Sequence, residues 1–173
     1  RELTTAEACA WLAGATAGAD YVTSLTYAQV TNATSVVGEM NNEASIAAIE
    51  AGQTFFSVDD EGNVILEYDI NSKVHIDSET PQDIKKNRPL RVYDSFENDC
   101  LIIFRPGKFD NDEDGWAVVE GLGRSMLQNY SDDGALTNVV LDEDFLVDTG
   151  RSVGDSMYLN IGLQAVDSAE KFY

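Results

Sequence analysis

Two stretches in the second half of the chain decide the fold: residues 88–104 read RPLRVYDSFENDCLIIF, and residues 113–130 read EDGWAVVEGLGRSMLQNY. In each, apolar residues recur three or four positions apart, which is the spacing of one helical face. They are Leu90, Tyr93, Phe96, Cys100, Ile103 and Phe104, then Trp116, Val119, Leu122, Met126, Leu127 and Tyr130. Pro106-Gly107 ends the first stretch and Gly134 the second. The sequence therefore predicts two long helices packed as an antiparallel pair.

The first third of the chain predicts two shorter helices. Thr4 and Glu7 have capping-box spacing at the start of an Ala-rich run. Asn42 can cap a short helix through residue 51, with Ile46 and Ile49 facing inward. Residues 21–30, rich in Tyr, Thr and Val, are predicted to be extended.

The remaining segments predict strands. Residues 55–58 and 64–70 flank a turn-forming cluster, Asp59 to Asn63, which is typical of a hairpin, and residues 138–147 and 157–166 predict two more strands. No internal repeat or linker divides the chain, so we expect a single domain over residues 1–173. The order of elements predicts an α+β fold, in which a mostly antiparallel sheet is packed by two long helices and shorter ones.

The charge of the chain limits its partners. Lys and Arg number 11 and Asp and Glu number 31, which gives a formal net charge of −20. A nucleic-acid-binding protein or a protein that docks on anionic membranes needs a basic surface, so we expect neither partner. No apolar run approaches the ~20 residues of a membrane-spanning helix.

The stretch Asp110-Asn-Asp-Glu-Asp-Gly115 is the sharpest local motif, because it fits the first half of an EF-hand loop. Asp110, Asp112 and Asp114 would then ligate calcium. The twelfth position, which should be a bidentate Glu, is Gly121. Acidic residues at the start of a helix also favour its dipole, so we favour a capping role. A calcium-dependent binding or adhesion module remains the alternative.

No residues form a recognisable catalytic site or cofactor site. Cys9 and Cys100 are predicted to be buried free thiols, with a disulfide as the other possibility, and His75 lies in a polar segment. A hydrolase would have only carboxylate pairs to rely on, and 31 acidic residues produce such pairs by chance. We therefore expect no enzyme activity and no cofactor.

The last predicted strand suggests an interface. Met157 to Val166 alternates regularly, and one of its faces comprises Tyr158, Asn160, Gly162, Gln164 and Val166. An amphipathic strand near the end of a chain can add to the sheet edge of another molecule, although an ordinary strand with a frayed tail would show the same pattern.

Several segments, taken in order, resemble phage tail-sheath proteins of Gram-positive prophages. The segments are residues 8–19 (ACAWLAGATAGA) with Ser24-Leu-Thr-Tyr27, residues 64–71 with Lys86-Asn-Arg88 and Arg91-Val-Tyr-Asp94, Gly107-Lys108 with Asn111 to Gly115, and Val166-Asp-Ser-Ala-Glu-Lys-Phe-Tyr173. The resemblance covers nearly the whole chain, and it implies the C-terminal portion of a longer protein, without its N-terminal regions.

The resemblance implies a structural polymer. Sheath subunits of this kind stack around a tail tube, and their contraction drives the tube through a cell envelope, as in phages, bacteriocins and secretion systems. The implied partners are neighbouring copies, the tube protein, and baseplate and terminator proteins. The implied location is the virion tail sheath, assembled in the cytoplasm of a bacterial host. Residues 168–173 would form an arm between subunits, which adds Glu170, Lys171, Phe172 and Tyr173 to the predicted interface.

Overall fold

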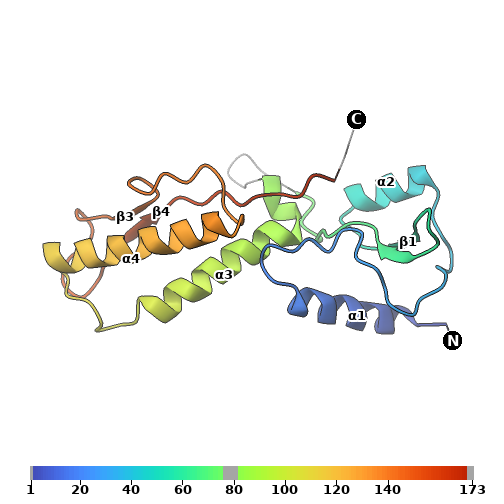
Figure 1. Ribbon diagram of the computed structural model, residues 1–173, viewed down its shortest axis with the longest axis horizontal. Helices are drawn as coiled ribbons and strands as arrows, with labels where there is room; N and C mark the ends of the chain where they lie inside the picture. The colour runs from blue at the N-terminus through green and yellow to red at the C-terminus, as the bar shows by residue number, and fades with distance from the viewer. Residues whose placement is uncertain (1, 76–81, 171–173) are drawn as a thin grey trace. The chain divides into compact units, whose positions relative to one another are not determined.

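The computed structural model describes residues 2–75 and 82–170, and its contacts divide the chain into two compact units. Unit 1 comprises residues 1–90 and 167–173, and unit 2 comprises residues 91–166. In chain order the elements are α1 (Thr5–Gly18), α2 (Asn42–Glu50), β1 (Phe56–Val58), β2 (Val64–Leu66), the 3₁₀ turn η1 (Gln82–Lys85), α3 (Asn87–Ile103), α4 (Glu113–Asp132), β3 (Phe145–Val147) and β4 (Leu159–Ile161) (Figure 1). The α+β class is confirmed. Helix α3 belongs to both units, because it continues across the boundary after Leu90. That residues 1–173 form a single domain stays a prediction.

Strand β2 forms the centre of unit 1. It pairs antiparallel with β1, as the predicted hairpin requires, and Asp59 closes the turn by accepting the backbone N–H groups of Glu61 and Asn63. On its other edge, β2 exchanges backbone hydrogen bonds with residues 27–30. Strand β2 is shorter than the strand predicted over 64–70. All three of its residues are buried, whereas the alternation predicted a strand with one buried face.

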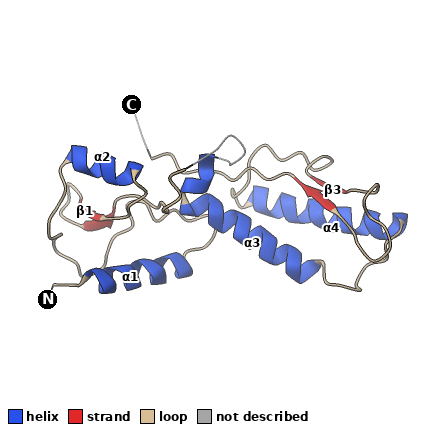
Figure 2. Cartoon of the chain, turned by 180° about the vertical axis from the view of Figure 1, so that it is seen from behind, coloured by secondary structure: helices blue, strands red, loops and turns tan. Residues whose placement is uncertain are grey.

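Helices α1 and α2 are drawn on either side of β1 (Figure 2). The capping box of α1 is present: Thr4 accepts from the Glu7 N–H, and the Glu7 carboxylate accepts from the Thr4 N–H. The edge-to-face contact of Trp11 with Phe56 joins α1 to β1, although α1 has no fully buried residue. In α2 the cap is Asn41, one residue before the prediction, and Ile46 is exposed rather than inward.

The predicted antiparallel helix pair is the core of unit 2, with α3 and α4 side by side in Figure 1. Phe96 of α3 meets Tyr130 of α4 edge to face, with ring centroids 5.3 Å apart. Leu122 was predicted to face the core, but its side chain is 37% exposed. The neighbouring Gly123 faces inward instead, because the ring of Phe145 fills the space where a side chain would stand.

The last two strands are shorter than predicted and pair only with each other. Residues 138–144 form a turn instead of a strand, because the Asp144 carboxylate accepts the Val140 N–H. Beyond β4 the chain changes partner at Gly162, and Ala165 then forms a bridge with Leu136. The described residues therefore contain two small antiparallel sheets rather than one larger sheet.

Both cysteines are free, but neither is fully buried as predicted, and Cys9 is exposed. Cys100 is half-buried, and desolvation together with the charges of Asp99 and Glu97 raises its pKa to about 11. His75 is exposed. Among the described residues, no helix is long and apolar enough to cross a membrane.

Candidate subunit interface

Strand β4 has one paired edge and one open edge. The Asp148 N–H donates to Tyr158 O and the Gly162 N–H donates to Asp144 O, so the main-chain groups of even-numbered residues in this stretch face β3. In an antiparallel ladder the alternate residues point their N–H and C=O groups the other way. Leu159 and Ile161 are these residues, and their backbone groups have no hydrogen-bond partner among residues 2–75 and 82–170. This edge can accept another strand.

Helix α4 covers the outer edge of β3, where Phe145 and Val147 are buried. The Val147 N–H, which points away from β4, donates to the Glu120 carboxylate at 2.9 Å. Arg124 lies 3.4 Å from Glu120 and 3.3 Å from Asp142, so the carboxylate is itself held in place. This small sheet is therefore open on the β4 side.

The structure places the four predicted strand residues in two environments. Tyr158 is 41% exposed, with the Arg151 guanidinium 4.2 Å from its ring centroid. Asn160, which pairs with Leu146 of β3, is also exposed. Gln164 accepts from the Asn138 side chain and from the Thr137 N–H. The Val166 N–H donates to Ala135 O. Tyr158 and Asn160 thus lie along the open strand, whereas Gln164 and Val166 already contact residues 135–138.

The predicted arm begins with contacts inside its own chain. Lys86 Nζ lies 2.9 Å from Asp167 Oδ2 and 2.6 Å from Glu170 Oε2, and Thr26 Oγ1 donates to Glu170 Oε1 at 2.8 Å. Arg88 donates to Ser168 Oγ at 3.2 Å. We call these six residues the C-terminal clamp: Thr26, Lys86, Arg88, Asp167, Ser168 and Glu170. The other predicted arm residues, Lys171, Phe172 and Tyr173, lie outside the described residues.

The clamp alters the acid–base properties of its neighbours. Desolvation by burial lowers the pKa of Lys86, but the hydrogen bonds to Glu170 and Asp167 outweigh it, and the net pKa is raised. Burial, followed by the charge of Glu170, raises the pKa of Tyr68. Lys86 is therefore held as a cation between two carboxylates.

The acidic stretch 110–115 starts helix α4. Asp112 is the N-cap and accepts the Gly115 N–H at 2.9 Å, as the capping interpretation predicted. Asn111 accepts from the Trp116 indole N–H and donates to the carbonyls of Gly154 and Ser156. A Cβ on residue 115 would stand 2.0 Å from the Asp110 carbonyl, so a glycine is required there.

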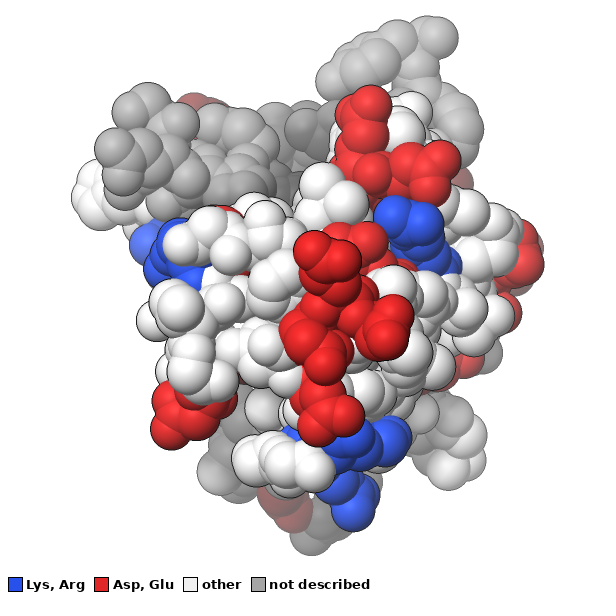
Figure 3. Space-filling model, turned by 90° about the vertical axis from the view of Figure 1, so that its left-hand side faces the viewer, with Lys and Arg blue, Asp and Glu red and all other residues white. Residues whose placement is uncertain are grey.

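The same stretch was the candidate metal site. Asp110, Asp112 and Asp114 are exposed, and Figure 3 shows acidic side chains gathered on the face near the start of α4. No group of three or more His, Cys, Asp or Glu side chains within the described parts of the chain is arranged to hold a metal ion. The geometry therefore supports helix capping and gives no support to the calcium alternative.

Sequence reasoning missed the groups that close β3 and hold residues 167–170. Lys86 and Thr26 lie in segments of the family resemblance, which gives them no role. Glu120 lies in a predicted helix whose prediction rests on its apolar residues. A signal for Lys86 was available, because five of the eleven basic residues lie between residues 73 and 91. They are Lys73, Lys85, Lys86, Arg88 and Arg91.

Comparisons with known proteins agree with this architecture. The model of the phage tail sheath protein central domain matches residues 1–72, and that of the phage tail sheath C-terminal domain matches residues 79–173. The Phage-like element PBSX protein XkdK of Bacillus subtilis (strain 168) is 31% identical over 182 residues, which cover 99% of this chain and 39% of XkdK.

Solved structures give the same result. The sheath tail protein of Desulfitobacterium hafniense is 32% identical, with a TM-score of 0.87 over 96% of this chain and 39% of that protein. The helical sheath of the anti-feeding prophage in its contracted state shares the fold, with a TM-score of 0.71 at 17% identity, over 95% of this chain and 48% of that one. The chain thus spans about two fifths of the length of the curated relative. On the match of the C-terminal domain model to residues 79–173, the chain belongs to the phage tail sheath family.

Proposed function

We propose that this chain is part of a structural subunit of a contractile phage or phage-tail-like sheath. Copies would polymerise around a tail tube and contract to drive it through a cell envelope. Tube, baseplate and terminator proteins would be its further partners, in a tail assembled in the cytoplasm of the host. The role would be mechanical, without catalysis.

The open edge of β4 is the observation that carries this proposal. A subunit that polymerises needs a directional contact, and a strand edge supplies a row of hydrogen bonds in one register. Tyr158 and Asn160 lie along this strand, which supports their assignment to the interface. Gln164, Val166, Glu170, Lys171, Phe172 and Tyr173 remain proposed interface residues on the pattern and the resemblance.

The test is to block that edge without disturbing the sheet. In the full-length protein, Ile161→Pro removes the N–H that points away from β3, so no bond of the ladder to β3 is lost. We expect this variant to keep a wild-type melting curve but to form no tubes in electron micrographs. Ile161→Thr, which retains the N–H, is the matched control and should form tubes.

Two results would contradict the proposal. If wild-type protein forms no tubes with its tail components present, the sheath function itself is wrong. If Ile161→Pro assembles normally, the subunits join through another surface. Should Ile161→Pro fail to fold, Leu159→Pro blocks the same edge one pair along and replaces it in the test.

A further inference from the structure

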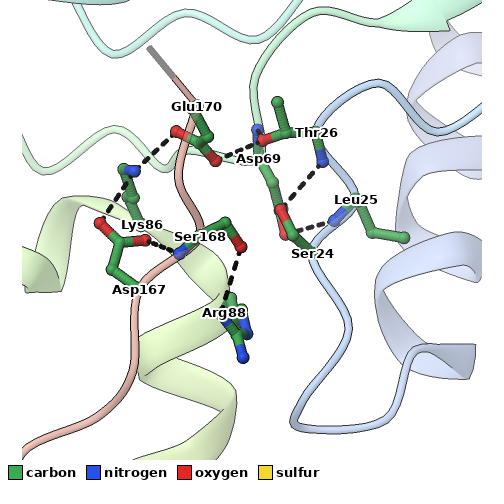
Figure 4. A network of polar contacts seen from close by, with 9 residues as sticks. All are labelled: Ser24, Leu25, Thr26, Asp69, Lys86, Arg88, Asp167, Ser168 and Glu170. Atoms are coloured by element: carbon green, nitrogen blue, oxygen red, sulfur yellow. Dashed lines mark hydrogen bonds and ion pairs between the residues drawn. The ribbon is translucent and has the colours of Figure 1, made fainter. Parts of the chain in front are cut away.

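Four short segments that are distant in the sequence meet inside unit 1 (Figure 4). They are residues 24–27, Asp69, residues 86–88 and residues 167–170. The open edge of β4 lies in unit 2 and uses none of them. The C-terminal clamp therefore needs an explanation of its own.

A buried carboxylate fixes the receiving side of the clamp. Asp69 is 2% exposed, and its oxygens accept the Leu25 N–H at 3.0 Å and the Asn87 amide at 2.9 Å. A buried charge with several hydrogen bonds holds its donors in place, because losing any of them leaves polar groups unsatisfied. Asp69 thus joins residues 24–27 to the start of α3 within unit 1.

Thr26 is prepared to bind an acceptor. The backbone N–H of Asp69 donates to Thr26 Oγ1 at 3.0 Å. An N–H can only donate, so the hydroxyl accepts there and its own hydrogen is available for another group. Glu170 Oε1 receives it at 2.8 Å. The hydroxyl of Thr26 is therefore oriented to donate to a hydrogen-bond acceptor at this position.

Charge and burial make the contact specific. Glu170 has a side chain only 8% exposed, and a buried carboxylate is stable only when paired, as it is with Lys86. Asp167 contacts the same ammonium group. In a chain with 31 acidic residues, the basic stretch 73–91 is a distinctive place for an acidic segment to bind.

We propose that the C-terminal clamp is a permanent anchor, made within each subunit, and that any arm between subunits begins only after Glu170. Of the arm predicted at residues 168–173, residues 168–170 then belong to the anchor. Lys86 and Thr26 are positioning residues, because their contacts fix where residues 167–170 lie in unit 1. The purpose of the arm rests on the proposed sheath function, whereas the clamp itself does not.

The anchor can be measured in the unassembled subunit. A nitroxide spin label on Ala169→Cys, an exposed position inside the clamped segment, reports the mobility of that segment. The other cysteines of the full-length protein, Cys9 and Cys100 among them, are first replaced by Ser or Ala. We expect an immobilised spectrum in dilute full-length monomer. Lys86→Met keeps the aliphatic stem but removes both ion pairs. The fraction of mobile label should rise roughly tenfold, because the loss of a half-buried ion pair has an effect between those of an exposed and a buried pair.

Lys85→Met is the matched control, because it removes the same charge from the adjacent residue, whose side chain is exposed and outside the clamp. The label should stay immobilised in this variant. Glu170→Gln, which keeps the shape of the side chain, should loosen the label as Lys86→Met does. A label that is unaffected by both Lys86→Met and Glu170→Gln would overturn the anchor.

Assembly separates the anchor from the proposed function. A label that is mobile in the monomer and immobilised only in tubes would mean that the clamp forms between subunits, and the proposal would be wrong. If wild-type protein fails to form tubes while the monomer label is immobilised, the sheath function fails and the anchor stands. If both are correct, Lys86→Met should yield fewer or irregular tubes, and Lys85→Met should match wild type.

Discussion

The two units are stabilised at their centres by different chemistry. Unit 2 packs aromatic rings between helices: Phe96 and Phe145 are almost fully buried. Unit 1 buries the apolar strand β2 and, beside it, the carboxylate of Asp69 with its hydrogen-bond donors. Apolar packing is non-directional and tolerates adjustment, whereas a buried carboxylate requires each donor at its place. Unit 1 therefore holds the donors of Asp69 at fixed positions, whereas the helices of unit 2 support β3 through the apolar packing of Phe145.

The largest effect should come from removing an aromatic ring in unit 2. We predict that Phe96→Ala lowers the free energy of unfolding by about 3–5 kcal/mol, because it deletes a buried aromatic side chain that packs on Tyr130. Denaturant unfolding measures this. Leu101→Ala, on the same helix but with Leu101 67% exposed, is the control and should stay within about 0.5 kcal/mol of wild type. A loss for Phe96→Ala no larger than that of the control would contradict the packed helix pair.

The polar centre of unit 1 should respond next. Asp69→Ala leaves the Leu25 N–H and the Asn87 amide without their acceptor, so we predict a loss of about 2–3 kcal/mol in the free energy of unfolding. Asp60→Ala, at an exposed position in the hairpin turn, should change it by less than about 0.5 kcal/mol. Equal effects of the two variants would mean that Asp69 does not hold unit 1 together.

Two glycines of α4 test the apolar packing of unit 2 within one helix. A Cβ on residue 123 would stand 2.2 Å from the Phe145 ring, so Gly123→Ala should destabilise by about 1–3 kcal/mol through overpacking. A Cβ on residue 121 meets nothing within 4 Å. Gly121→Ala should therefore stabilise by up to about 1 kcal/mol, from helix propensity alone. Thermal melts of the two variants should shift in opposite directions, and a shift of both in the same direction would refute the assignment.

The smallest expected effect concerns the acidic stretch that starts α4. Because Asp112 caps the helix and the acidic side chains of this stretch are exposed, calorimetric titration with calcium should show no binding tighter than ~1 mM. Micromolar binding that disappears when Asp110, Asp112 and Asp114 are changed to Ala would restore the calcium module.

Periodicity and capping signals predicted the helices, because α-helices are set by contacts between residues three or four apart. Thr4 with Glu7 and the stripe from Phe96 to Phe104 are local signals of this kind. The lengths of the strands were overestimated, since alternation does not reveal where the pairing with a neighbouring strand ends. Residues 138–144 form a turn that the Asp144 carboxylate stabilises, and beyond Gly162 the chain pairs with another segment.

The strand of the proposed interface was predictable in part. Alternation pointed to the strand that contains Tyr158 and Asn160, but it could not show which edge is open, because that depends on Glu120, 27 residues before Val147. The clamp joins Thr26 to Glu170 across 144 residues, and no local pattern carries such information. The need for glycine at position 123 could not be predicted for the same reason, since Phe145 lies beyond the helix end.

The hydrogen bond of the Glu120 carboxylate limits the number of strands that can join the small sheet of unit 2. With the Val147 N–H bonded to α4 and both Phe145 and Val147 buried, an incoming strand would find an accessible edge only alongside β4, so the sheet would accept one foreign strand. A sheet open at both edges could continue to recruit strands without limit, as fibrils do. In the proposed sheath, growth by single, saturable additions would instead give a lattice in which the number of strand donors equals the number of acceptors.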